Sequence, residues 1–443
     1  DVVHRQRRVV TEAAALGDDG EVFAWSRDCA IAQQWVGVIQ VPGLQIEILP
    51  KVDFGPSDGT REENFSWVEA RRNLLYMLAV AGHVPVRSRD VARLTTRRAP
   101  LLDALAALFA ESLVVELLKG PEAGYVGFEE SLRVFKGRLL VSRQVSENAA
   151  HRERFYCRFD EYSTDTPMNR AFKAACRQLL LWTRSAETQD ALRRCLLILD
   201  FVADESPVDA DLKRVLFNRQ NERFSTLFDF ARLVLSGQSP TARAGADRSF
   251  SLLFDMNKVF ERFVAAFLAS RVMPDLPDFR LFPQARHNRR PLFEIDGGGV
   301  ALPLEPDLLV RHAASNRHFV LDTKWKRLPA TGQDKGQGGV SNSDLYQLLA
   351  YAQRFGCAQS VLLYPAVPGV FRRDFHALDD RHERSGRRVS VRFVNVNRDL
   401  CSELERSALA EELRVLVSEG IGQAMAGASA EQAGVGVVAE GVA

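Results

Sequence analysis

Two aspartates stand at the ends of short apolar segments, where an isolated carboxylate would be costly. Asp307 precedes the apolar run 308–310, and Asp322 follows the apolar run 319–321. Carboxylates are rarely buried unless they are paired or bound to a metal. Lys324 lies two residues after Asp322, so the two side chains share a face if this segment is a strand. Two carboxylates and a lysine near one strand end indicate chemistry on a phosphate ester.

The chemistry follows from the preferences of each group. Carboxylate oxygens are the ligands that Mg²⁺ prefers, and the cation acidifies a bound water and stabilises charge on a phosphoryl oxygen. A lysine beside it can orient that water or neutralise the phosphate. We therefore predict Asp307 and Asp322 as catalytic metal ligands for Mg²⁺ and Lys324 as a catalytic residue. The polar run 311–317 is short, which favours two adjacent antiparallel strands, although sequence alone does not fix their register.

The Asp-x-Lys pattern alone is weakly specific, because the chain contains a second copy at 211–213. That copy lies in a polar segment without a preceding apolar strand, and we expect a solvated helix terminus there. Only 306–324 combines Pro-Asp, an apolar strand, a short loop, a second apolar strand and Asp-x-Lys. The alternative for this segment is an edge hairpin with an ion pair from Asp322 to Lys324 or Lys326, which would contribute little.

Three flanking residues are candidates for completing the site. Glu261 lies in a segment expected to be helical and could reach the metal or its water; the alternative is a solvent-facing glutamate. Gln347 and Tyr351 are four residues apart on a predicted helix, which places them on one face. There they could bind phosphate or support Lys324, or they could serve only amphipathic packing.

The elements that must position these residues divide the chain into parts. Residues 1 to about 60 alternate like strands, and helical periodicity follows from about 64, over 101–119, and again over 166–184, 187–202 and 220–236. The loop-like segment 236–247 precedes a predicted helix over 249–272, then strands and a helix over 343–355. We predict an α+β multidomain chain. Its parts are a small β-rich domain (1–95), a mostly helical region (96–245), an α/β domain with a central mixed sheet (246–415) and a disordered tail (416–443).

Composition limits the possible functions. The chain has 443 residues with 58 Lys+Arg and 57 Asp+Glu, which excludes a globally basic coat for nucleic acid but not a local basic patch. The basic stretch that contains Arg286, Arg289 and Arg290 is the best candidate for contact with a DNA backbone; the alternative is a solvated loop. Six cysteines without a CxxC pair favour a reducing, cytoplasmic location. No apolar run approaches the roughly 20 residues that cross a bilayer, so we expect no membrane contact.

The succession of Pro-Asp, Asp-x-Lys and Gln-x-x-x-Tyr resembles the PD-(D/E)xK nuclease superfamily and its RecB-like branch. Segments such as "LLKGPEAGYV", "FDEYSTDTPMNRAF", "LDTKWK" and "DLYQLLAYA" occur in the order found in McrC proteins, the nuclease subunits of McrBC modification-dependent restriction systems. The resemblance runs from about residue 35 to about residue 400. It implies a restriction-endonuclease-like fold for the C-terminal domain, with Asp307, Asp322 and Lys324 matching the cleavage motif.

The resemblance also implies partners. It implies that the N-terminal domain docks on a ring-forming AAA+ GTPase, McrB, and that the chain cuts modified, methylated double-stranded DNA with Mg²⁺. The chain has no GxxxxGK[ST] motif, so nucleotide-driven movement would come from another polypeptide. Two alternatives stay open. One is a non-catalytic adaptor that activates an AAA+ partner, and the other is a stand-alone RecB-like nuclease in DNA repair.

Overall fold

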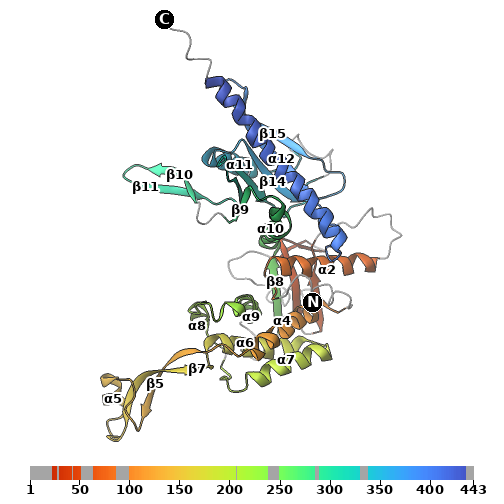
Figure 1. Ribbon diagram of the computed structural model, residues 1–443. Coiled ribbons are helices and arrows are strands. Elements are labelled where there is room, and N and C mark those ends of the chain that lie inside the picture. The colour runs from red at the N-terminus through yellow and green to blue at the C-terminus, as the bar shows by residue number, and fades with distance from the viewer. Residues whose placement is uncertain are drawn as a thin grey trace.

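The fold is a mixed α+β arrangement in which sheets and helical layers alternate along the chain (Figure 1). The computed structural model describes residues 22–26, 29–41, 43–50, 63–85, 99–205, 207–237, 249–284, 289–329 and 338–435, and the side chains of 63–66 and 421–435 are not included in that description. Within these ranges no helix is both long and apolar enough to span a lipid bilayer.

The N-terminal strands share a sheet with a strand that follows the helical region. The order is β4 (Leu44–Ile48), β3 (Trp35–Val41) and β8 (Phe250–Asp255), all antiparallel. A Cβ on Gly37 would lie 2.0 Å from the Leu252 carbonyl oxygen, so only glycine permits this close approach of β3 to β8. A separate small hairpin joins β1 (Phe23–Trp25) to β2 (Ala30–Ala32). The sheet therefore includes residues on both sides of the expected domain boundary at 245/246.

The predicted helix over 249–272 is wrong in its first part, because residues 250–255 form strand β8. The helix α10 (Met256–Phe267) begins only after Asp255, whose side chain accepts a hydrogen bond from the Asn257 backbone N–H. A short π-helix, η4 (Leu268–Val272), and a short 3₁₀-helix, η5 (Met273–Asp275), continue it. The apolar run of β8 fits either structure locally, and pairing with the distant β3 decides for a strand.

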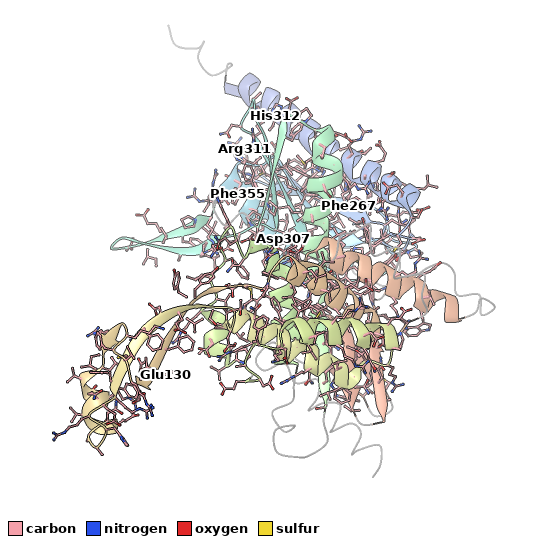
Figure 2. All side chains as sticks on the ribbon, turned by 60° about the horizontal axis from the view of Figure 1, so that its bottom comes forward. Glu130, Phe267, Asp307, Arg311, His312 and Phe355 are labelled. Carbon is pink, nitrogen blue, oxygen red and sulfur yellow. The ribbon has the colours of Figure 1, made fainter. Side chains whose placement is uncertain are left out.

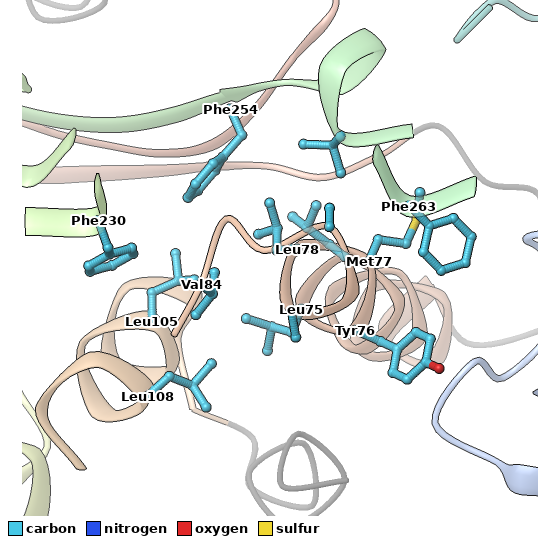
Figure 3. Close-up of a cluster of buried hydrophobic side chains, with 14 of the residues drawn as sticks. Leu75, Tyr76, Met77, Leu78, Val84, Leu105, Leu108, Phe230, Phe254 and Phe263 are labelled. Atoms are coloured by element: carbon cyan, nitrogen blue, oxygen red, sulfur yellow. The ribbon is translucent and has the colours of Figure 1, made fainter. Parts of the chain in front are cut away.

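The helices that the periodicity predicts between about residue 64 and residue 236 are present. They are α2 (Glu63–Val80), α4 (Leu101–Leu118), α6 (Pro167–Trp182), α7 (Ala186–Ile198), α8 (Asp209–Lys213), η2 (Glu222–Phe224) and α9 (Ser225–Ser236). Figure 3 shows Leu75 and Leu78 of α2 and Leu105 of α4 in one cluster with Phe254 and Phe263. The amide of Asn73 on α2 also donates to the carbonyl oxygens of Val396 and Arg398. Helix α2 therefore ties the helical region to the C-terminal domain.

One part of the middle region is a sheet instead of helices. The strands β5 (Gly124–Leu132), β7 (Phe155–Ser163) and β6 (Arg138–Leu139) and the short helix α5 (Val141–Glu147) form an arm that projects from the helical body (Figure 1). Tyr125 and Tyr162 stand edge to face on it, with ring centroids 5.5 Å apart. The description of 96–245 as mostly helical therefore misses this arm.

The C-terminal domain has the predicted central mixed sheet. Its strand order is β15 (Arg373–Leu378), β16 (Arg384–Val394), β14 (Gln359–Pro365), β13 (His318–Thr323), β12 (Leu308–His312) and β9 (Phe279–Pro283). Strands β13, β14 and β16 run parallel, and the other pairs are antiparallel. A separate hairpin of β10 (Arg290–Ile295) and β11 (Gly299–Leu304) turns at the Asp-Gly-Gly-Gly sequence of residues 296–299 and projects outward (Figure 1).

Helices cover both faces of this sheet. Helix α11 (Asn342–Phe355) packs in a core with Leu309, Val320 and Leu362, whereas Leu308 and Leu321 face the larger core that α10 and α12 share. Helix α12 runs from Glu403 to Val435. The predicted disordered tail is therefore helical up to Val435, consistent with the high helix propensity of its many alanines; residues 436–443 lie outside the described residues.

Candidate active site

The register of one hairpin brings the two predicted carboxylates together. Leu308 of β12 pairs with Leu321 of β13, so Asp307 and Asp322 follow at the same end of the two strands. Asp307 Oδ2 accepts hydrogen bonds from the Thr323 backbone N–H (2.7 Å) and from Thr323 Oγ1 (2.8 Å). Figure 2 shows Asp307 and His312 at opposite ends of β12. The short polar loop thus gives the antiparallel pair that the sequence predicts, and the pairing fixes the site at this end of the sheet.

Asp322 is the most unusual of these groups because its ionisable carboxyl group is buried. Its side chain is 1% exposed, and Lys324 Nζ lies 2.8 Å from Oδ2. Among the described residues, Oδ1 has no hydrogen-bond donor. Burial raises the pKa of Asp322 to about 7, with the charge of Asp307 adding to the effect and Lys324 opposing it. A carboxylate in this position favours either a proton or a cation.

Lys324 is held by a chain of hydrogen bonds that begins on helix α11. Its ammonium donates to Gln347 Oε1 (3.2 Å), and Gln347 Nε2 donates to the Tyr351 hydroxyl (2.8 Å). That hydroxyl donates in turn to the Glu305 carbonyl oxygen (3.1 Å). Burial alone would lower the pKa of Lys324, but Asp322 and Asp307 outweigh it, so the pKa is raised and the ammonium is favoured. The chain fixes where the positive charge stands.

A third acid, Glu261, lies near Asp307. Glu261 on α10 accepts a hydrogen bond from Gln284 Nε2 at its Oε1 (3.0 Å). Burial and the charge of Asp307 raise the pKa of Glu261. Burial also raises the pKa of Asp307, while the Thr323 hydrogen bonds and the charge of Lys324 lower it. Glu261 therefore lies within electrostatic range of Asp307.

The residues present fit a Mg²⁺ ion whose ligands come only in part from the protein. No three His, Cys, Asp or Glu side chains within the described ranges are arranged as a ready metal cage. Mg²⁺ is held in phosphoryl-transfer sites by one or two carboxylates, with waters and substrate phosphate as the other ligands. Asp307 and the unpartnered Asp322 Oδ1 supply that number of carboxylates. The donor set is therefore suited to a hard, oxygen-seeking divalent ion.

Comparison with known families gives the context for this geometry. The family described as "McrBC 5-methylcytosine restriction system component" matches residues 30–365, which is most of the chain. The chain belongs to this family. The resemblance to McrC inferred from the sequence segments is thereby confirmed.

One solved structure of an McrBC assembly has a similar fold, and a second is a weaker match. A Thermococcus gammatolerans structure described as a half-complex from a tetradecameric assembly of McrB AAA+ hexamers with bound McrC matches with a TM-score of 0.56 and 23% identity. The match covers 89% of this chain and 86% of that one. The T. gammatolerans McrBC complex matches with a TM-score of 0.42 and 25% identity over 62% of this chain and 82% of that one. No curated protein matches.

The basic residues predicted to contact DNA have different positions in this McrBC family member. Arg286 lies outside the described residues. Arg289 Nε lies 2.5 Å from Glu305 Oε1, close to the carbonyl that accepts the Tyr351 hydrogen bond. Arg290 donates to the Arg354 carbonyl oxygen (3.0 Å) and covers the Phe355 ring. Both flank the site at the base of the β10–β11 hairpin, and their contact with DNA stays a prediction.

Three residues near the site are absent from the sequence prediction. Thr323 is the middle residue of the Asp-x-Lys tripeptide and binds Asp307. The pairing of β9 with β12 brings Gln284 to the site, and no local sequence pattern predicts that pairing. Asp344, whose Oδ2 accepts from the Tyr364 hydroxyl (3.3 Å), raises the pKa of Asp322. It lies one helical turn before Gln347, so the i, i+3 spacing could have found it.

Proposed function

We propose that this McrBC family member is a Mg²⁺-dependent endodeoxyribonuclease subunit with a PD-(D/E)xK domain that hydrolyses phosphodiester bonds of modified double-stranded DNA. The observation that carries the proposal is Asp322, a carboxylate of 1% exposure with one unpartnered oxygen, next to Asp307 and Lys324 at a strand end. Burying a charge without full pairing costs several kcal/mol, and a structural ion pair alone would not leave Oδ1 unpartnered. A bound cation removes that cost.

Each residue has a distinct role in the reaction. Asp307 and Asp322 would hold the Mg²⁺, which when bound supplies an activated water and stabilises charge on the phosphate. Lys324, kept cationic by Asp322 and aimed by Gln347, neutralises the phosphate oxygens or orients the attacking water. Glu261, whose raised pKa makes it a better proton acceptor than an ordinary glutamate, faces the same cation or its water. Tyr351 positions Gln347.

The same proposal includes an AAA+ partner. The chain itself carries no GxxxxGK[ST] loop, whereas the T. gammatolerans structure with the matching fold is described as McrB AAA+ hexamers with bound McrC. We therefore propose that a cytoplasmic McrB-like GTPase ring binds this chain through its N-terminal domain and is stimulated by it. DNA movement would then come from the ring and hydrolysis from the site at Asp322.

Cleavage of plasmid DNA tests the proposal against its alternatives. Methylated and unmethylated plasmids are incubated with the full chain, with and without the McrB-like partner and GTP, in Mg²⁺ or in EDTA. The expected result is cutting of the methylated plasmid that needs Mg²⁺, GTP and the partner. Stimulated GTP hydrolysis without cutting would identify an adaptor. Cutting without the partner would identify a stand-alone nuclease.

A further inference from the structure

Asp344 is a carboxylate beside the candidate active site that the proposed reaction does not use. It lies in the first turn of helix α11, and its spacing from Leu348 and Tyr351 places the three side chains on one face of the helix. Leu348 and Tyr351 are buried in the core between α11 and the sheet. Asp344 therefore lies on the helix face that packs against the sheet, one turn before Gln347.

The strands place Asp322 and Lys324 on the sheet face that α11 covers. Val320 belongs to the core under α11, and Asp322 and Lys324 follow it at two-residue steps, on the same face of β13. The neighbouring parallel strand β14 contributes the buried Tyr364 to that core. The Tyr364 hydroxyl donates a hydrogen bond to Asp344 Oδ2 (3.3 Å). This hydrogen bond fixes the Asp344 carboxylate at the strand end where Lys324 lies.

The charge of Asp344 acts on both Asp322 and Lys324. Burial raises the pKa of Asp322 to about 7, and the charge of Asp344 adds to the rise. Burial lowers the pKa of Lys324, whereas Asp322 and, more weakly, Asp344 raise it. Asp344 is therefore close enough to attract the ammonium group, although the ion pair of Lys324 is with Asp322.

A divalent cation at Asp322 would compete with Lys324 for the carboxylate. The ammonium lies 2.8 Å from Asp322 Oδ2, so a cation bound to the same carboxylate would repel it. Asp307, which also attracts Lys324, is itself a proposed Mg²⁺ ligand. Asp344 is not a proposed ligand, and it lies one turn from Gln347, whose Oε1 accepts from Lys324 (3.2 Å). Its negative charge therefore stays available to the ammonium when a cation occupies Asp322.

We propose that Asp344 is a positioning residue, which attracts the Lys324 ammonium away from Asp322 and so allows Asp322 to bind Mg²⁺. The inference rests on the proposed nuclease function, because it concerns the same cation and the same lysine. In this arrangement Gln347 and Asp344 hold Lys324 from helix α11, beside the cation and not in its place. The alternative is that Asp344 serves only the start of the helix and the Tyr364 hydroxyl.

Cation binding to the full chain without DNA tests the inference. Urea unfolding at rising Mg²⁺ concentrations and one fixed pH gives an apparent dissociation constant, because a cation that binds only the folded state raises the free energy of unfolding. Asp344→Asn keeps the shape of the side chain and an acceptor for Tyr364 but removes the charge. We expect this variant to raise the apparent dissociation constant for Mg²⁺ roughly tenfold, as is typical of residues that support metal ligands. The measured quantity is the gain in stability with Mg²⁺, so a general loss of stability does not imitate the result.

A double-mutant cycle with Lys324→Met shows whether Asp344 acts through the lysine. Methionine keeps an apolar side chain and removes the ammonium. In that background Asp344→Asn should change the dissociation constant by no more than about twofold, as expected for a charge that acts on the cation only through solvent. Glu305→Gln is the matched control, because it also removes one negative charge beside the site, where Glu305 pairs with Arg289. It should likewise stay within about twofold of the wild type.

An unchanged dissociation constant in Asp344→Asn would overturn the inference. So would an equal loss of affinity with and without the Lys324 ammonium, an equal loss in Glu305→Gln, or a wild type that Mg²⁺ does not stabilise. The proposed function is tested separately. Mg²⁺-dependent cutting that Asp322→Ala abolishes would establish the nuclease whatever the role of Asp344.

Discussion

The chain contains two Asp-x-Lys tripeptides that share residue types and differ in surroundings. Asp322 is 1% exposed at the end of a buried strand, and its lysine lies 2.8 Å away. Asp211 is 44% exposed on the five-residue helix α8, where its side chain lies 3.9 Å from Arg214 and Lys213 pairs with Asp209 instead. Water solvates the Asp211 carboxylate, whereas the buried Asp322 carboxylate has lost its water and contacts Lys324 in its place. Burial, and not the tripeptide itself, makes a carboxylate that gains by binding a cation.

The largest expected difference between the two tripeptides is their effect on catalysis. Asp322→Ala removes a proposed Mg²⁺ ligand and should lower the rate of DNA cleavage more than about 1000-fold, well beyond the 10–100-fold typical of residues that only support metal ligands. Asp211→Ala, its matched control, should retain the wild-type rate. Plasmid nicking at saturating Mg²⁺ measures both, with binding to the proposed GTPase partner as the check on folding. Comparable rates for the two variants would remove the basis of the assignment.

The second difference is in how stability depends on pH. The pKa of Asp322 is about 7 in the fold and near 3.9 in an unfolded chain. Between these values the folded state binds more protons than the unfolded state, so the free energy of unfolding falls as pH rises from about 4 to 7. This group accounts for a loss of up to about 4 kcal/mol, since each pKa unit corresponds to about 1.4 kcal/mol.

Urea unfolding in EDTA at pH 5 and pH 8 measures that loss. Asp322→Asn should flatten the pH dependence, and Asp211→Asn should not change it. Mg²⁺ should restore stability to the wild type at pH 8 but not to Asp322→Asn, because the cation stabilises the ionised carboxylate. Wild-type stability that rises with pH in EDTA would contradict a buried, destabilising Asp322. So would a pH dependence that Asp322→Asn leaves unchanged.

The two tripeptides also show how far the sequence can be interpreted. The apolar runs on both sides of residues 311–317 predict two strands. The connection between them is short, which favours an antiparallel pair, and that pair places Asp307 beside Asp322. The polar surroundings of Asp211 correctly predict a solvated helix. Both predictions are local, because strand and helix periodicity appear within a few residues.

The missed features depend on partners that are distant in the sequence. Residues 250–255 form a strand because β3, more than two hundred residues earlier, hydrogen-bonds to them. Gln284 reaches Glu261 only through the pairing of β9 with β12. Register is set by tertiary packing, so a single sequence indicates which segments are strands but not which strands are neighbours.

The lysines of the two tripeptides differ in their support. Lys324 donates to Gln347, whereas Lys213 is 68% exposed and pairs with Asp209 on the same helix. Gln347→Ala frees the Lys324 ammonium and leaves the Tyr351 hydroxyl with one partner fewer. We expect Gln347→Ala to lower the cleavage rate by roughly 10–100-fold and to leave partner binding unchanged. Gln347→Glu, which retains an acceptor for Lys324, should recover part of the rate; equal loss in both would assign Gln347 to packing.

The smallest difference concerns the middle residues, Thr323 and Leu212. Thr323→Val keeps the shape and the backbone hydrogen bond to Asp307 but removes the hydroxyl donor at 2.8 Å. One such bond contributes about 1 kcal/mol, so cleavage should fall several-fold, and Thr323→Ser should keep the wild-type rate. Leu212, 7% exposed in the helical core, has no polar role, so Leu212→Ala should cost about 2 kcal/mol or more of stability and leave the cleavage rate of folded protein unchanged. Cleavage rates and urea midpoints measured on the same preparations separate the two effects. No rate loss in Thr323→Val would show that the hydroxyl of Thr323 does not orient Asp307 for catalysis. A rate loss in folded Leu212→Ala would show that the cleavage rate follows stability, which would remove this comparison as a test of the hydroxyl.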